Sequence, residues 1–197
     1  THARWAGDVR LMALTSLNLG ALAIHRGEFA AALSHLRRAL VDFRRMDAPE
    51  HMASALANLA LVYTRLARWD DALGAFAEAV AIAERGDNRE SLATILLNEA
   101  EMWIARGRLG PAHDACERAR EACDRTTHRA LAGEVCRVRG IIARDGGRAE
   151  EADAHFAEAE RIATEREDLV LLAETAREQA ELYRAQGRNR DTFTALN

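Results

Sequence analysis

Small and large apolar residues alternate along this chain in a pattern that returns every 40 residues. Four segments superimpose without a gap when their first alanines are aligned, and these are Ala32, Ala72, Ala112 and Ala152. In each segment a larger residue follows four positions later and another alanine seven positions later. Positions i, i+4 and i+7 lie on one face of an α-helix. The pattern therefore predicts one helix per unit with small residues along its buried side.

A second stripe of small residues precedes the first and has the same period. Its members are Gly20, Ala60, Ala100, Gly140 and Ala180. Seven residues further on, four units carry a glycine, namely Gly27, Gly107, Gly147 and Gly187, and the other carries Ala67. Glycine is favoured just past a helix end because it lacks the Cβ atom that makes a left-handed cap unfavourable. Each unit is therefore predicted to be a helix A, a tight turn and a helix B.

The two stripes predict an all-α fold in which antiparallel helix pairs stack into an α-solenoid. The A helices are expected near 8–26, 50–66, 88–106, 128–146 and 168–186, and the B helices near 29–45, 69–85, 109–125 and 149–165. This gives a single domain over 1–197 with five repeats at 8–47, 48–87, 88–127, 128–167 and 168–197, the last of them incomplete. No single pair can bury both faces of its helices, so stacking between neighbours supplies the stability.

The segment from residue 56 to residue 79, LANLALVYTRLARWDDALGAFAEA, resembles the tetratricopeptide repeat family in its 40-residue variety. Asn18-Leu19-Gly20 and the segment 182–187, LYRAQG, are similar to the same family pattern. The resemblance implies a right-handed superhelix that binds another protein, as a peptide or a helix, in a concave groove lined by the A helices. The chain has no initial Met and ends inside a repeat, so we expect the docking or sensory part of a larger bacterial regulatory or signalling protein.

The resemblance also implies which residues face the groove. Asn18, Asn58 and Asn98 are 40 residues apart and correspond to inward-facing asparagines that hydrogen-bond a bound peptide backbone in related repeats. An amide suits that role because it offers both a donor and an acceptor. Alternatively, the three asparagines bond neighbouring helices and hold the superhelix together.

Helical spacing places apolar residues beside these asparagines and charged residues further along the same face. The apolar set is Leu14, Leu17, Ala21, Ile24, Leu61, Leu97 and Ile104. The charged set is Arg65, Glu101, Glu134, Arg137, Arg144, Glu174, Arg177, Glu181 and Arg184. The arginines are candidates for binding a partner's carboxylates. In the alternative interpretation, the charges pair within their own helices at i, i+3, as Glu134 with Arg137 and Glu174 with Arg177.

Composition narrows the classes of function. The net charge is −4 with both signs interspersed, which argues against direct nucleic-acid binding. No apolar run approaches the ~20 residues that a membrane-spanning helix needs. All 27 basic residues are arginine, so chemistry that depends on a lysine is excluded. The odd number of cysteines, three, indicates free thiols in a reducing compartment, and we expect the cytoplasm.

We find no constellation that predicts catalysis, and we expect no enzyme, cofactor or metal. His113, Cys116, Cys123 and Cys136 could be imagined around zinc, but Cys116 occupies the column that holds Leu or Phe in other units. A buried cysteine acting as a small hydrophobic residue fits better.

Two other functions remain open. One is self-assembly through the terminal helices, with Leu172, Ala176 and Tyr183 meeting Trp5 and Met12 of another copy. The other is a sensor for a signalling peptide or a small molecule.

Overall fold

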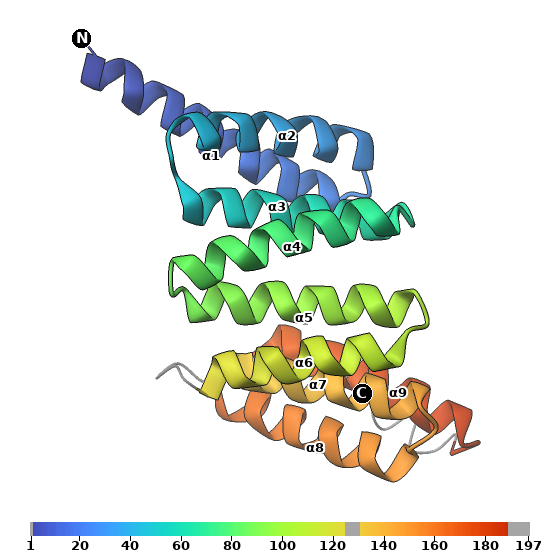
Figure 1. Ribbon diagram of the computed structural model, residues 1–197. Coiled ribbons are helices and arrows are strands. Elements are labelled where there is room, and N and C mark those ends of the chain that lie inside the picture. The colour runs from blue at the N-terminus through green and yellow to red at the C-terminus, as the bar shows by residue number, and fades with distance from the viewer. Residues whose placement is uncertain (1, 125–130, 189–197) are drawn as a thin grey trace.

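The computed structural model describes residues 2–124 and 131–188, and the side chains from residue 9 onward. Within these ranges every regular element is a helix (Figure 1). The A helices are α1 (His2–His25), α3 (Pro49–Arg65), α5 (Arg89–Ala105), α7 (Ala132–Asp145) and α9 (Leu169–Ala185). The B helices are α2 (Phe29–Arg45), α4 (Trp69–Arg85), α6 (Leu109–Asp124) and α8 (Ala149–Glu165).

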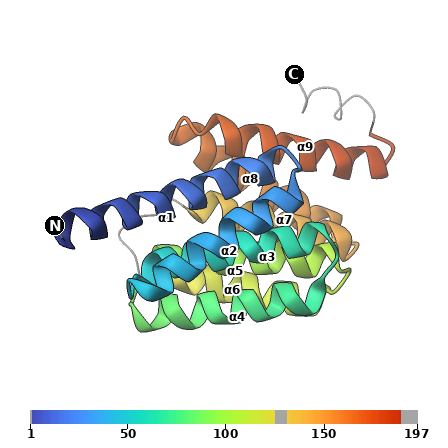
Figure 2. The same ribbon diagram turned by 90° about the horizontal axis from the view of Figure 1, so that it is seen from above.

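The helices stack as antiparallel pairs in chain order. Helices α1 and α2 form the first pair, and the same arrangement follows for α3 with α4, α5 with α6, and α7 with α8. Each B helix also packs on the A helix of the next pair, so α2 contacts α3 and α8 contacts α9. Seen from above, successive pairs are rotated relative to one another, and the stack curls (Figure 2). The predicted solenoid of tandem helix pairs is confirmed.

Both stripes of small residues lie in the core. The first and last alanines of the B stripe are fully buried in all four units, and so are Leu36, Phe76 and Phe156 between them. The A-helix stripe is buried as well, and at Gly140 it admits no side chain. A Cβ atom on Gly140 would lie 2.4 Å from the ring of Phe156. The small residues therefore allow helices of one pair to approach closely while a large residue fills the adjacent space.

A left-handed residue follows every helix except α6, after which 125–130 lie outside the described residues, and elsewhere these residues are spaced by 20. The predicted glycines adopt φ values of 71–76°, and Ala67 adopts the same region with φ 54°. Between repeats, where the sequence has no glycine at this position, Asp47, Asp87 and Glu167 have φ values of 49–55°. In the first turn Gly27 N–H donates to Ile24 O at 3.0 Å and Glu28 N–H to Ala23 O at 2.9 Å, which is the Schellman pattern.

Two predicted helix starts are wrong. Helix α1 begins at His2 rather than at residue 8, and no proline interrupts the helix between these two positions. Helix α7 begins at Ala132 rather than at residue 128, and 128–130 lie outside the described residues. The remaining described ends fall within two residues of the prediction.

Candidate functional site

The A helices form the inner face of the curved stack. Each of them contacts the A helix of the next repeat, from α1 with α3 to α7 with α9. The backbones of successive B helices lie further apart within the described ranges, and ion pairs such as Arg44 with Glu78 and Arg118 with Glu84 bridge them. A stack of paired helices bends toward the row in which neighbours lie closer, so the A helices line the groove that the resemblance implied.

Three asparagines follow one another across this groove, on α1, α3 and α5. We call Asn18, Asn58 and Asn98 the asparagine ladder. Asn58 and Asn98 are half-buried and line one cavity of about 400 Å³, and Asn18 is exposed. None of the three amides hydrogen-bonds to another described residue. The alternative that the ladder ties neighbouring helices together thus finds no hydrogen bond in its favour.

Asn88 shows what a structural asparagine looks like in this chain. It precedes α5, and its side-chain oxygen accepts a hydrogen bond from Ser91 N–H at 3.0 Å. This contact satisfies one of the free N–H groups at the helix start. The amides of the ladder lie in the middle of their helices, where the backbone groups are already paired, and they remain available to a ligand.

Apolar side chains accompany the ladder. Leu17 on α1, Leu61 on α3 and Ile104 on α5 are half-buried, with part of each side chain open to the groove. Leu14, Ala21 and Ile24 on α1 are half-buried as well. Leu97 differs from this expectation because it is only 6% exposed and belongs to the core.

The charged part of the groove is centred on Arg137 of α7, which is only 7% exposed. Its guanidinium lies 2.5 Å from Glu101 of α5 and 2.9 Å from Glu134 of its own helix. Glu174 of α9 lies 3.5 Å from the same group. One side chain therefore joins three A helices. The i, i+3 pair with Glu134 was predictable, whereas the partners on α5 and α9 were not.

A second arginine, Arg144, joins α7 to α9. It lies 2.6 Å from Glu178 and 3.1 Å from Glu181. Arg177 also binds Glu178, at 3.0 Å, so the expected pair between Arg177 and Glu174 is not formed. The sequence reasoning missed Glu178, which is buried at the position that the asparagine ladder would occupy in α9.

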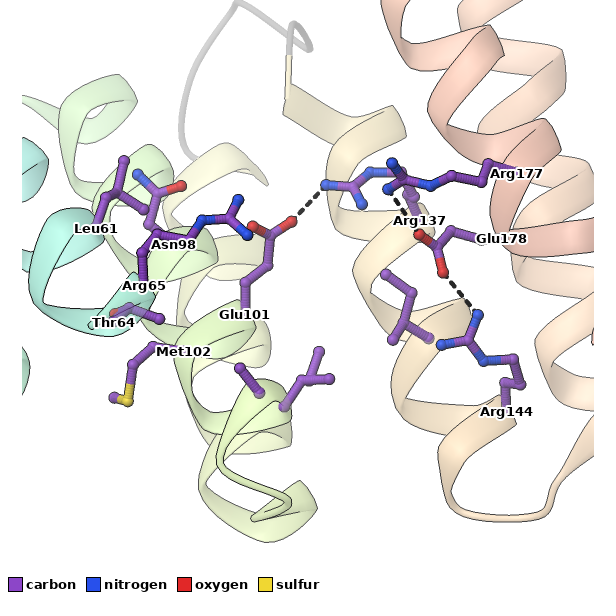
Figure 3. A pocket seen from close by; sticks show the side chains of 13 residues that line it. Leu61, Thr64, Arg65, Asn98, Glu101, Met102, Arg137, Arg144, Arg177 and Glu178 are labelled. Atoms are coloured by element: carbon purple, nitrogen blue, oxygen red, sulfur yellow. Dashed lines mark hydrogen bonds and ion pairs between the residues drawn. The ribbon is translucent and has the colours of Figure 1, made fainter. Parts of the chain in front are cut away.

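Most of the predicted groove residues meet around one cavity of about 290 Å³ (Figure 3). Its walls include Leu61, Arg65, Asn98, Glu101 and Ile104 from α3 and α5, and Arg137, Arg144, Arg177 and Glu178 from α7 and α9. Arg65 is exposed and forms no ion pair with any described residue, unlike the other arginines of this cavity. Asn18 and Leu17 lie on α1, away from this cavity, and Asn58 lines the neighbouring one.

Burial and neighbouring charges shift the pKa values of several groups in and behind the groove. Burial raises the pKa of the Glu134 carboxyl above its ordinary value, against the opposing effect of Arg137. Although burial acts in the other direction, Glu101 and Glu134 raise the pKa of Arg137, which is therefore fully charged. Burial also raises the pKa of the Cys116 thiol to about 12. Cys116 thus stays protonated at neutral pH and is a poor nucleophile and metal ligand.

Two further findings limit the chemistry of the described part of the chain. No group of three or more His, Cys, Asp or Glu side chains there is placed to hold a metal ion. Each helix in the same ranges is too short or too polar to cross a lipid bilayer.

Comparison with known proteins agrees with the geometry. A family model described as tetratricopeptide repeat matches residues 11–85 and 51–125, and a model of anaphase-promoting complex subunit 5 matches residues 139–185. The chain is 25% identical over 142 residues to protein kinesin light chain-related 1 of Arabidopsis thaliana. That match covers 69% of this chain and 22% of the relative, so the chain spans less than a quarter of its length.

Two solved structures share the fold. BtubC (BKLC) from P. vanneervenii superimposes with a TM-score of 0.75 and 21% identity, over 95% of this chain and 78% of that one. Aspartyl phosphate phosphatase F from Bacillus subtilis gives a TM-score of 0.77 at 12% identity, over 94% of this chain and 58% of that one. The stacked helix pairs, the buried 40-residue stripes and a family model that matches more than half of the sequence lead to one conclusion: the chain belongs to the tetratricopeptide repeat family.

Proposed function

We propose that this chain is a protein-interaction module that binds an extended segment of another polypeptide along its groove. The observation that carries the proposal is the asparagine ladder, whose amides have no hydrogen-bond partner among the described residues. Amides left open beside half-buried leucines suit a peptide backbone, which presents N–H and C=O groups in alternation.

The two halves of the groove contribute differently to this function. In the half formed by α1, α3 and α5, amide and apolar groups are open to a ligand. In the half formed by α7 and α9, Arg137, Arg144 and Arg177 are already paired with carboxylates of the chain itself. A ligand therefore gains most from contacts to the first half, and among the arginines of the 290 Å³ cavity Arg65 is the one open to a partner's carboxylate.

The test removes the asparagine ladder and compares the result with the loss of a helix cap outside the ladder's cavity. A peptide is selected on the intact chain from a random linear library, and its affinity is measured by calorimetry for each variant. Asn58→Ala combined with Asn98→Ala should weaken binding by about tenfold or more, since each net hydrogen bond contributes ~0.5–1.5 kcal/mol. The melting temperature should stay unchanged.

Asp168→Ala provides the matched control, because Asn88 itself lines the cavity of Asn58 and Asn98. It removes the cap of α9 and should lower the free energy of unfolding by about 1 kcal/mol while leaving peptide affinity intact. If the ladder variant instead melts earlier and binds as before, the asparagines are structural and the proposal is wrong.

Self-association is a second candidate, supported by the outer face of α1. Met12, Leu19 and Leu22 are exposed there. The corresponding residues of α3, which packs on α2, are Met52, Leu59 and Val62, and they are buried or half-buried. Of the residues expected to meet this face, Leu172 and Ala176 are half-buried. Trp5, which was expected to belong to the α1 face together with Met12, lies outside the described side chains.

Tyr183 already has a partner within the chain, since its hydroxyl donates to Asp153 at 2.6 Å. Light scattering over a concentration series separates the two candidates. A molecular mass that rises with concentration in the intact chain, and not in Leu19→Glu, supports association through α1.

We also propose that the module works in the cytoplasm of a bacterium, as the docking or sensory part of a larger regulatory or signalling protein. Cys116, Cys123 and Cys136 are free thiols, which supports a reducing compartment. The small share of its plant relative that the chain spans supports a role as one part of a longer polypeptide. A signalling peptide is one form that the extended ligand can take.

A further inference from the structure

Two arginines connect the A helices of the last three repeats on the groove side. Arg137 contacts carboxylates of α5 and α9 in addition to its own helix, and Arg144 contacts two carboxylates of α9. No described ion pair links α1, α3 and α5 to one another. The inner row is thus held by charge in one half and by apolar contacts in the other.

The position of Arg137 makes these contacts strong. Its side chain is only 9% exposed, so the ion pairs are screened less by salt than pairs at the surface. Its planar guanidinium can donate in several directions at once, which a lysine ammonium cannot do in the same geometry. Three carboxylates surround this single cation, and they would repel one another if it were removed.

We propose that Arg137 and Arg144 form an electrostatic clasp that fixes the spacing of α5, α7 and α9 and so sets the curvature of the C-terminal half of the groove. The two arginines act as positioning residues for the groove. This inference concerns the shape of the chain without a ligand, so it goes beyond the proposed peptide binding and can be tested separately from it.

The clasp has a directional consequence. Loss of its charges releases α9 from α5 and widens the C-terminal half, while the spacing of α1, α3 and α5 does not change. In a variant that lacks Arg137, no cation at this position offsets the mutual repulsion of Glu101, Glu134 and Glu174. Arg144 and Glu178, which also link α7 to α9, remain in place in that variant.

Double electron–electron resonance, which measures the distance between two spin labels, tests the proposal. Labels are introduced as unnatural amino acids, because the chain has three cysteines of its own. One pair at the exposed residues Thr94 and Ala173 spans α5 to α9, and another at Thr15 and Thr94 spans α1 to α5. Arg137→Gln should lengthen and broaden the first distance and leave the second unchanged, and Arg137→Lys should give an intermediate shift.

Arg118→Gln is the matched control, because it removes an inter-repeat ion pair of the same kind from the outer row. Arg118 lies 3.3 Å from Glu84 of α4, and both side chains are about half exposed. Neither distance should change in that variant. If Arg137→Gln does not fold, Glu101→Gln with Glu174→Gln removes both cross-helix partners and keeps the buried pair with Glu134.

The double variant should also lengthen the distance between α5 and α9, by less than Arg137→Gln because no excess negative charge is created. An unchanged distance in a folded variant overturns the proposal. Equal lengthening of both label pairs overturns it too, since that result indicates general loosening of the stack. Both outcomes concern the clasp alone and leave the peptide-binding proposal to its own test.

Discussion

The two halves of the groove have the same 40-residue repeat, but the residues at equivalent positions of their A helices differ. In α1, α3 and α5 one inner position is Asn18, Asn58 and Asn98, and in α7 and α9 the same position is Val138 and Glu178. Val138 is fully buried, and Glu178 is paired with two arginines. The N-terminal half thus leaves polar groups open, whereas the C-terminal half uses them internally.

Packing in the stack restricts the residue types at core positions much more strictly than those on the inner face. The alanines that mediate helix pairing are identical in all four B helices, because any larger residue would separate the helices. Residues of the inner face contact a ligand or one another, so their identity can change without loss of the fold. Function therefore diverges on the A helices while the B stripes stay constant.

The largest expected effects concern the shared core. Phe76→Ala in the N-terminal half and Phe156→Ala in the C-terminal half should each lower the free energy of unfolding by about 3–5 kcal/mol. Both rings are fully buried between alanines of the same stripe. Denaturant unfolding followed by circular dichroism measures both losses. A much smaller loss for Phe156→Ala would show that the C-terminal half is packed loosely, and the comparison would then extend to the core.

A smaller effect is expected at the A-helix stripe. Gly140→Ala should destabilise the chain by about 1–3 kcal/mol, because the new methyl group would overlap the ring of Phe156. The N-terminal half has Ala60 at the same position, opposite Phe76. If Gly140→Ala leaves the free energy of unfolding unchanged in the same experiment, α7 and α8 can move apart to admit a methyl group. The glycine at this position would then not be required by the packing of Phe156.

The smallest effect concerns the turn within the second repeat. Ala67 holds a left-handed conformation that glycine adopts at the other A–B turns. Ala67→Gly should raise the free energy of unfolding by roughly 0.5–1 kcal/mol, since the relief of strain exceeds the added entropy of the unfolded chain. Gly147→Ala in the C-terminal half should produce a loss of similar size. Differential scanning calorimetry of both variants measures the two changes in stability. If both variants are stabilised, or both destabilised, this explanation is wrong.

The sequence predicted the fold because its determinants are local and repeated. Small residues at fixed positions specify where helices touch, and glycines specify where four of them end, so most boundaries came out within two residues. The start of α7 was missed because a core stripe says where a helix packs and not where its first turn forms. The turns between repeats were found as loops, but their left-handed residues were not, since Asp47, Asp87 and Glu167 carry no glycine signal.

The candidate site was less predictable for a physical reason. Helical spacing gives partners on the same helix, which is how the pair between Glu134 and Arg137 was expected. The bond from Glu101 to Arg137 joins residues on different helices, and it depends on how repeats three and four are rotated against each other. The spacing of residues along the sequence does not reveal how one repeat is rotated against the next. The open state of the asparagine amides likewise became visible only in three dimensions.

The 20-residue spacing of left-handed residues has a consequence for how such a chain can change length. Among the described turns each helix with its link takes up 20 residues, and α6 with α7 takes up 40 from Gly107 to Gly147, so turns of the same type are interchangeable junctions. Duplication or excision between such junctions preserves every interface on either side, whereas an insertion of any other size would rotate one helix by ~100° per residue and disrupt its stripe. The stack can therefore change its length only in whole repeats, and a longer or shorter ligand can be matched by adding or removing such repeats.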